Sequence, residues 1–298
     1  MRRRAFLGAL AGLAVTRAAG GAERLHARTI PASGEALPVV GLGTWQSFDV
    51  GSDAAARAPL GEVLKTLFDG GGRVVDSSAM YGASESVVGE LCTGLGICEP
   101  LFLASKVWTR GRDEGVRQMQ RSIERMRAGR MDLLQVHNLV DVETHTKTLL
   151  EWKAAKRVRY IGITHYTASA HAELERWLRT KQHDFVQVNY SLEQPQAQER
   201  LLPLARELGV AVIVNRPFAD GGMFRRVRGK GLPPWAAELG IASWAQYFLK
   251  WIVSHPAVTC VIPGTGNPAH MRDNLGAGLG AMPDAALRRR MAEHYASL

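Results

Sequence analysis

Short apolar runs and longer amphipathic segments alternate along this chain. The apolar runs are rich in β-branched side chains, which favour strands over helices. Eight runs occur, at residues 39–45, 73–77, 101–107, 131–138, 159–164, 185–191, 210–216 and 259–264. Strands that alternate with helices in this way are typical of a parallel sheet covered by helices.

The segments between the runs have helical periodicity. After the first run, Leu60, Val63, Leu64, Leu67 and Phe68 fall on one face, and three glycines at residues 70–72 end the pattern. Comparable segments run at about 115–128, 143–156, 168–179, 197–208 and 241–254, with a final helix at 283–294. Residues 28–37, with a turn at 33–35, predict a β-hairpin. Eight strand–helix units without a linker then predict one closed (β/α)8 TIM barrel of the α/β class, rather than an open two-domain sheet.

The first 22 residues have a different pattern. Arginines at positions 2–4 precede an apolar run at 5–15, which is short for a membrane span, and small residues follow. The segment from Arg3 to Leu7 (Arg-Arg-Ala-Phe-Leu) resembles the bacterial twin-arginine export motif. We expect a signal peptide over residues 1–22, recognised by the twin-arginine export machinery, and a barrel domain over 23–298 in the periplasm or otherwise exported. A disordered basic tail and an uncleaved anchor are the alternatives.

Composition and charge limit the classes of partner that this protein can bind. The 298 residues are 46% hydrophobic and 22% charged, which is ordinary for a globular protein with no stable membrane anchor. The formal net charge is +9, but four of the positive charges lie in the expected signal peptide and the others are scattered. Without a nucleic-acid motif, this charge predicts no nucleic-acid partner. A polyanionic cofactor would account for part of the excess positive charge. We expect the protein to be a monomer.

The three cysteines are Cys92, Cys98 and Cys260. An odd number at these spacings predicts neither a disulfide framework nor a metal site. Cys260 stands in an apolar run and is expected to be a buried thiol.

Polar residues at the ends of the apolar runs are the candidates for chemistry, because barrels of this class build their active sites at the carboxyl ends of the strands. Asp76 ends the second run, and Tyr81 follows five residues later. Lys106 ends the third run, and His137 ends the fourth. Each residue alone also fits a cap or ordinary packing, but four on consecutive strand ends predict a cluster.

The strings around these residues resemble those of the aldo-keto reductase superfamily. The resemblance covers Gly41 to Trp45, Asp76 to Gly82, Ala104 to Val107 and Asp132 to Asn138, and it continues in order through Ile161 to Thr164, Val186 to Ser191 and Ile262 to Asn274. It therefore extends over nearly the whole expected mature chain. It implies reduction of a small-molecule carbonyl, or the reverse oxidation, with a nicotinamide cofactor.

The resemblance also implies a role for each candidate. Tyr81 would donate a proton to the carbonyl oxygen, and Lys106 would stabilise its phenolate. Asp76 would hold Lys106, and His137 would orient the carbonyl by a hydrogen bond. Trp45 and Trp108 are expected as apolar walls of the substrate pocket. The sequence predicts no metal.

The segments expected to bind the cofactor resemble those of the family less closely than the segments around the four candidates do. The resemblance implies that Gly43, Thr44 and Asp76, then Thr164, His165 and Gln187, then Asn215, Arg216 and Pro217 contact the cofactor. Many relatives have a stacking aromatic residue where this chain has Asn215, so Tyr190 or Phe218 is expected to supply the stacking instead.

The last cofactor segment begins a helix at Asn267 and Pro268, whose backbone N–H groups suit a phosphate. Thr265, Asn267, His270, Asp273 and Asn274 are the expected contacts. Two basic residues that are common in relatives fall on Gly264 and His270 here. We nevertheless favour NADPH over NADH.

Two other functions stay open. The same fold also forms non-catalytic cofactor-sensing subunits, and a barrel aldolase or isomerase would use Lys106 as a Schiff base.

Overall fold

Eight parallel strands form a nearly closed barrel in the computed structural model, which describes residues 24–298; the signal peptide expected over residues 1–22 lies outside them. Each strand pairs with the next in chain order, and bridges from Val40 to Val261 and from Gly43 to Gly264 join the ends of the sheet. The strands are β3 (Leu42–Gly43), β4 (Val74–Asp76), β5 (Phe102–Val107), β6 (Met131–His137), β7 (Val158–Thr164), β8 (Phe185–Asn189), β9 (Ala211–Asn215) and β10 (Cys260–Val261). Every predicted apolar run overlaps one of them, so the predicted barrel is confirmed.

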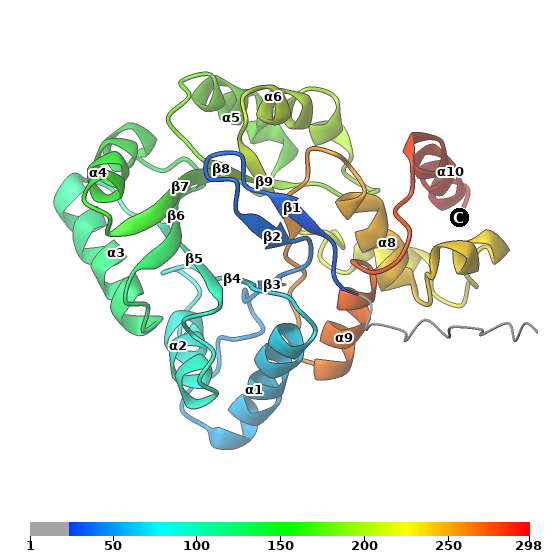
Figure 1. The fold of residues 1–298 in the computed structure, drawn as a ribbon, viewed down its shortest axis with the longest axis horizontal. Coiled ribbons are helices and arrows are strands. Elements are labelled where there is room, and N and C mark those ends of the chain that lie inside the picture. The colour runs from blue at the N-terminus through cyan, green and yellow to red at the C-terminus, as the bar shows by residue number, and fades with distance from the viewer. Residues whose placement is uncertain (1–23) are drawn as a thin grey trace, which may run out of the picture.

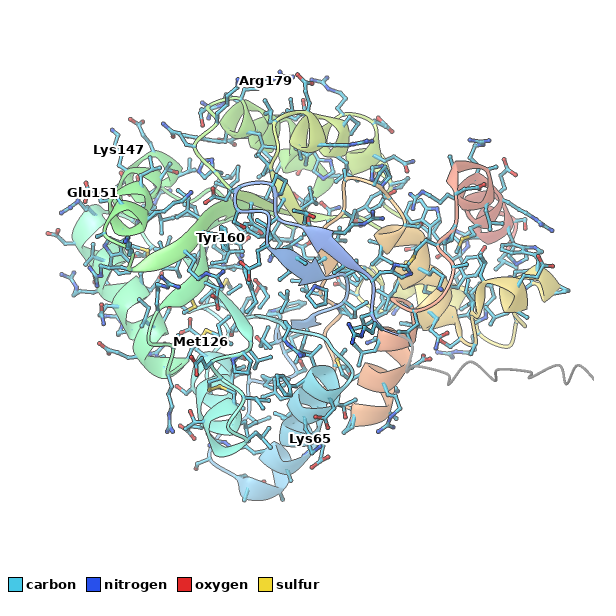
Figure 2. All side chains as sticks on the ribbon, viewed as in Figure 1. Lys65, Met126, Lys147, Glu151, Tyr160 and Arg179 are labelled. Atoms are coloured by element: carbon cyan, nitrogen blue, oxygen red, sulfur yellow. A yellow bond between two sulfur atoms is a disulfide. The ribbon has the colours of Figure 1, made fainter. Side chains whose placement is uncertain are left out.

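Helices surround the barrel (Figure 1). They are α1 (Ala54–Asp69), α2 (Ser84–Gly94), α3 (Arg112–Arg125), α4 (Val142–Ala154), α5 (His171–Leu178), α6 (Leu201–Glu207), α7 (Gly222–Arg226), α8 (Trp244–Val253), α9 (Pro268–Gly276) and α10 (Ala285–Ala296), with short 3-10 helices η1 (Ala168–Ala170), η2 (Gln196–Gln198) and η3 (Pro234–Leu239). The helical periodicity did not predict α2. Figure 2 shows charged side chains such as Lys65, Lys147 and Arg179 on the outer helices, whereas Tyr160 lies near the centre of the ring.

The predicted β-hairpin precedes the barrel in the chain and covers the amino ends of its strands. Its strands, β1 (Ala27–Thr29) and β2 (Ala36–Pro38), pair antiparallel and lie across the middle of the ring in Figure 1. Ile30 and Leu37 of the hairpin are buried in one cluster with Phe102 and Phe185 from inside the barrel. The hairpin therefore covers the amino ends of the strands.

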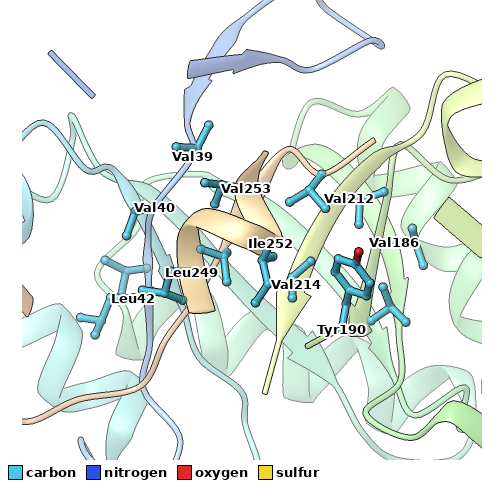
Figure 3. Close-up of a cluster of buried hydrophobic side chains, with 14 of the residues drawn as sticks. Val39, Val40, Leu42, Val186, Tyr190, Val212, Val214, Leu249, Ile252 and Val253 are labelled. Atoms are coloured by element: carbon cyan, nitrogen blue, oxygen red, sulfur yellow. The ribbon is translucent and has the colours of Figure 1, made fainter. Parts of the chain in front are cut away.

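The larger hydrophobic cluster lies between the strands and the helices. Figure 3 shows part of this cluster, including Leu249 and Ile252 of α8, Val214 of β9 and Leu42 of β3. Tyr190 packs in the same cluster.

Two of the three cysteines are joined. Cys92, near the end of α2, forms a disulfide with Cys98, after the chain turns at Gly96 with a φ of 67°. The expectation of no disulfide was therefore wrong, because the turn brings the two thiols together. Cys260 is fully buried as expected, and burial raises the pKa of its thiol.

Candidate active site

A cavity of about 770 Å³ opens at the carboxyl ends of the strands. Its lining includes twelve residues predicted for the site: Gly43, Thr44, Trp45, Asp76, Tyr81, Trp108, His137, Thr164, Gln187, Asn215, Arg216 and Pro217. Gly43 is required by the backbone here, because a Cβ atom at this position would lie 2.8 Å from the carbonyl oxygen of Ile262. All eight strands contribute to the lining, because Ile262, directly after β10, also lines the cavity.

Asp76 and Lys106 form a buried ion pair beneath the cavity. The ammonium of Lys106, whose side chain is 0% exposed, donates to Oδ2 of Asp76 at 2.5 Å and to the carbonyl oxygen of Ser77 at 2.6 Å. The other carboxylate oxygen of Asp76 accepts from the side-chain amides of Gln187 at 2.9 Å and Gln135 at 3.3 Å. A buried pair is stable only when its remaining hydrogen-bonding capacity is also used, and this pair meets that condition.

Tyr81 lies on the loop between β4 and α2, with the nitrogen of Lys106 5.0 Å from the centre of its ring. Asp49 holds this loop, because its carboxylate accepts from the N–H of Ala83 at 2.8 Å. Gly82 has a φ of 56°, and a Cβ atom there would overlap the Asp49 carboxylate. The loop geometry therefore depends on glycine at position 82.

Burial sets the pKa values of this cluster as strongly as charge does. Burial raises the pKa of Tyr81, and this effect exceeds the opposing effect of the Lys106 ammonium, so the net pKa lies above the usual value. The Lys106 ammonium opposes the effect of burial and favours the phenolate, which is the direction expected from the sequence. For Lys106, burial lowers the pKa, but Asp76 and Tyr81 outweigh it and the net shift is upward. Lys106 is consequently a permanent cation at neutral pH.

His137, the last residue of β6, faces Tyr81 edge-on. Their ring centres are 5.8 Å apart at an interplanar angle of 81°, and the ring of Trp108 lies 6.5 Å from that of His137. Burial, together with the nearby Lys106 charge, lowers the pKa of His137 to about 2. The imidazole is therefore neutral across the physiological range, with one nitrogen protonated.

An amide network extends from Asp76 toward the later strands. Gln187, which donates to Asp76, accepts through its own oxygen from Thr164 at 3.1 Å and from Asn215 at 3.4 Å. Within residues 24–298, Oδ1 of Asn215 is buried without a hydrogen-bond partner. The network thus leaves one acceptor at the cavity wall unused.

Arg216 is the cation that lines the cavity, since Lys106 lies behind the wall. Its guanidinium is paired with Asp220 and lies 5.3 Å from the ring centre of Tyr166. Arg216 and Asp220 both have positive φ angles, 47° and 52°, so the loop after β9 is tightly folded. Phe218 also lines the cavity and can stack on a ligand, whereas Tyr190 is fully buried against Trp251 and cannot.

Six predicted cofactor residues do not line the cavity: His165, Thr265, Asn267, His270, Asp273 and Asn274. Nδ1 of His165 accepts from the N–H groups of Tyr166 and Thr167, which leaves Nε2 protonated. Asn267 caps α9 by accepting from Ala269, and Asp273 accepts from Ser243 and Gln246 of the neighbouring chain segment. Cofactor contact through these residues stays a prediction.

Sequence reasoning missed part of the lining. The additional residues are Gln46, Met80, Asn138, Tyr166, Asp220, Gly221, Phe224, Ile262 and Gly264. Trp45, Met80, Trp108, Tyr166 and Phe224 are large hydrophobic side chains that stay exposed, and all of them line this cavity. Met80 and Tyr166 are sequence neighbours of Tyr81 and His165, and this was the only signal available for them.

Within residues 24–298, no group of three or more His, Cys, Asp or Glu side chains is arranged to hold a metal ion. In that same part of the chain, no helix has the length and apolar character needed to cross a membrane.

Comparison with known proteins gives a consistent result. Residues 39–289 match the sequence profile of the Aldo/keto reductase family. The chain is 30% identical over 262 residues to the methylglyoxal reductase YeaE of Escherichia coli strain K12, covering 84% of this chain and 89% of that protein. The crystal structure of an aldo/keto reductase from Klebsiella pneumoniae in complex with NADP and acetate superposes with a TM-score of 0.74 at 25% identity, covering 88% of this chain and 93% of that one. A Klebsiella aldo-keto reductase in complex with NADPH has the same fold, with a TM-score of 0.76 at 24% identity over 92% and 95% of the two chains.

Proposed function

The chain belongs to the aldo/keto reductase family, and we propose that it is an NADPH-dependent reductase of an aldehyde or ketone, with Tyr81 as the proton donor. The observation that carries this proposal is the convergence of Tyr81, the Asp76–Lys106 pair and His137 on one cavity. Each of these groups has a task in carbonyl reduction.

Tyr81 gives its phenolic proton to the carbonyl oxygen as negative charge develops there. Its phenolate is stabilised by Lys106, which stays charged because Asp76 holds it. His137 is neutral and can donate one hydrogen bond to the same oxygen, which fixes the carbonyl beside Tyr81.

The cavity fits a nicotinamide cofactor. Such a cofactor supplies the hydride when it is bound. The unused Oδ1 of Asn215 suits a carboxamide N–H₂ group, and Phe218 suits a planar ring. Binding of NADP and NADPH by the Klebsiella proteins supports NADPH over NADH.

The two alternative functions have less support. A Schiff base needs a neutral, accessible amine, whereas Lys106 is buried, charged and paired with Asp76. A cofactor-sensing subunit has no need for a proton donor beside a buried ammonium.

The experiment that tests the function is fluorescence titration with NADPH and NADH, followed by a panel of carbonyl compounds with the preferred cofactor. The panel includes methylglyoxal, because the Escherichia coli relative is named for it. Binding of NADPH with turnover of at least one carbonyl is expected. Tight cofactor binding with no turnover of any carbonyl would favour the sensor, and tighter binding of NADH would overturn the cofactor assignment.

We also propose export to the periplasm through the twin-arginine pathway. That pathway carries folded proteins, so the cofactor is loaded before export. The disulfide between Cys92 and Cys98 supports an oxidising compartment, because disulfides persist there and are rare in the cytosol. The combined Arg3→Lys and Arg4→Lys change should leave the precursor unprocessed in the cytoplasm. Normal processing of this variant in a host with a working twin-arginine system would contradict the proposal.

A further inference from the structure

Ser78 contacts the imidazole of His137, which lines the cavity, but is not itself among the lining residues. Its hydroxyl oxygen is 3.0 Å from Nδ1 of His137, and its side chain is fully buried. The same oxygen accepts from the backbone N–H of Met80 at 3.4 Å. None of the roles assigned above uses this serine.

The direction of the Ser78–His137 hydrogen bond follows from where the hydroxyl proton can go. A serine hydroxyl has one proton to donate and two lone pairs that accept. Among residues 24–298, Nδ1 of His137 is the one acceptor within hydrogen-bonding distance of this hydroxyl. If Nδ1–H donated to the serine instead, the hydroxyl proton would be buried without a partner, which is unfavourable. Ser78 therefore donates, and Nδ1 accepts.

A neutral imidazole that accepts at Nδ1 carries its proton on Nε2. Nε2 is the nitrogen left for a ligand in the cavity, since Nδ1 is held by Ser78 and the residue lines the cavity. A carbonyl oxygen needs a donor at that place and would be repelled by a lone pair.

We propose that Ser78 is a positioning residue, which fixes His137 as the Nε2–H tautomer and so keeps its hydrogen-bond donor directed at the substrate carbonyl. This inference rests on the proposed function, because it concerns the same site. The neutral state of His137 supports it, since a protonated imidazole would donate from both nitrogens whatever Ser78 does.

The first test is spectroscopic and needs no substrate. Two-bond ¹H–¹⁵N correlation spectra of the histidine-labelled protein distinguish the two neutral tautomers, and the His137 signals are assigned by their loss in His137→Gln. The wild-type ring is expected to show a protonated Nε2, and Ser78→Ala is expected to shift the population toward protonated Nδ1. A wild-type ring protonated on Nδ1 would overturn the proposal, even if Ser78→Ala fails to fold.

The second test is kinetic, with Ser84→Ala as the matched control. Ser84 is also a fully buried serine close to Tyr81 in the chain, but in residues 24–298 its hydroxyl has no partner. Ser78→Ala is expected to lower kcat by about 10-fold, less than the roughly 100-fold or more for removing an oxyanion donor itself. The Kd for the cofactor should stay unchanged, and Ser84→Ala should retain wild-type kcat.

These outcomes separate the inference from the proposed function. Equal kcat values for Ser78→Ala and Ser84→Ala would overturn the role of Ser78, even if the tautomer shifts. If the wild-type protein reduces no carbonyl, the proposed function fails, while the spectra still decide whether Ser78 sets the tautomer.

Discussion

The two ends of the barrel contain the same types of polar residue in different arrangements. At the closed end, Arg159 donates to Asp132 at 2.7 Å and pairs with Glu35 of the hairpin, and the hydroxyl of Tyr160 donates to Glu35 at 2.7 Å. At the open end, Lys106 pairs with Asp76, and Tyr81 faces a cavity instead of a second carboxylate.

This difference shows what separates a structural charge cluster from a reactive one. At the closed end, Glu35 accepts the proton of Tyr160 in a hydrogen bond, and the hairpin covers the cluster. Both tyrosines lie beside a cation, since Arg159 is 5.2 Å from the ring centre of Tyr160 and Lys106 is 5.0 Å from that of Tyr81. Of the two, only Tyr81 lines a cavity with space for a substrate. The comparison predicts that equivalent substitutions affect activity at one end and only stability at the other.

Removal of the two tyrosine hydroxyls should give the largest contrast. Tyr81→Phe is expected to lower the reduction rate by about two to four orders of magnitude, the scale of a general acid, with cofactor affinity unchanged. Tyr160→Phe should retain the wild-type rate and lower the free energy of unfolding by about 1–2 kcal/mol, because its hydroxyl bonds to both Glu35 and Ser33. Steady-state kinetics with a good aldehyde measures the rates of the two variants, and urea denaturation measures the stability of Tyr160→Phe. A near wild-type rate in Tyr81→Phe would show that Tyr81 is not the proton donor.

The second-largest contrast is expected in the loss of stability when the cation at each end is replaced. Lys106→Met leaves Asp76 buried without its counter-ion and should lower the free energy of unfolding by about 3–5 kcal/mol. Arg159 is 29% exposed, and Asp132 keeps the N–H of Leu103 as a donor, so Arg159→Met should cost only about 1 kcal/mol. Urea denaturation measures both losses. Equal losses would mean that burial does not distinguish the two pairs.

Acid should destabilise both ends through histidines that are neutral in the fold. Burial lowers the pKa of His137 to about 2 and that of His183, at the closed end, to about 4, from 6.5 for an unperturbed group. The unfolded chain therefore binds protons first, and each histidine contributes stability that is lost as the pH falls below about 6.5. From pH 6.5 to 4 the loss is about 3 kcal/mol for each.

The contributions of the two histidines to the pH dependence of stability should differ below pH 4. The stability that His183 contributes stops falling near pH 4, whereas the stability that His137 contributes continues to fall toward pH 2. Denaturation of His137→Gln and His183→Gln across this range tests the order. An unchanged pH dependence in His137→Gln would show that this imidazole is already charged in the fold.

Loss of the disulfide should affect stability at the closed end and leave activity unchanged. It joins the carboxyl-terminal part of α2 to the chain that leads into β5, away from the cavity. Cys98→Ser should lower the free energy of unfolding by about 2 kcal/mol, because the bridge closes only a short loop, and should leave kcat unchanged. Reductant should have this effect on the wild type and none on the variant. A loss of kcat in Cys98→Ser would show that α2 transmits strain to the Tyr81 loop.

The alternation of apolar runs with helical segments predicted the barrel and the hairpin. Polar residues at or shortly after the strand ends predicted the cluster of Asp76, Tyr81, Lys106 and His137. Sequence reasoning missed α2, which contains Gly89 and Gly94, both poor helix formers. Gly89 has a tertiary cause, since a Cβ atom there would overlap the carbonyl oxygen of Arg125 at the end of α3. No pattern within α2 itself could show that contact.

The other features that the sequence did not predict also depend on contacts through space. The pairing of Cys92 with Cys98 depends on the turn at Gly96, and the net upward shift in the pKa of Tyr81 depends on how deeply its loop is packed. Ser78 stood in the string that carries Asp76 and Tyr81, but its significance comes from His137 on another strand.

The disulfide also has a consequence for how the protein matures. Three thiols allow three different bridges, so random oxidation could join the wrong pair. Cys260 is sealed inside the barrel, and its raised pKa keeps it from forming the reactive thiolate. Cys92 and Cys98 are already neighbours, with Cα atoms 4.8 Å apart. A chain that folds before oxidation can therefore form only this bridge, and its maturation requires an electron acceptor but no isomerase to correct mispaired sulfurs.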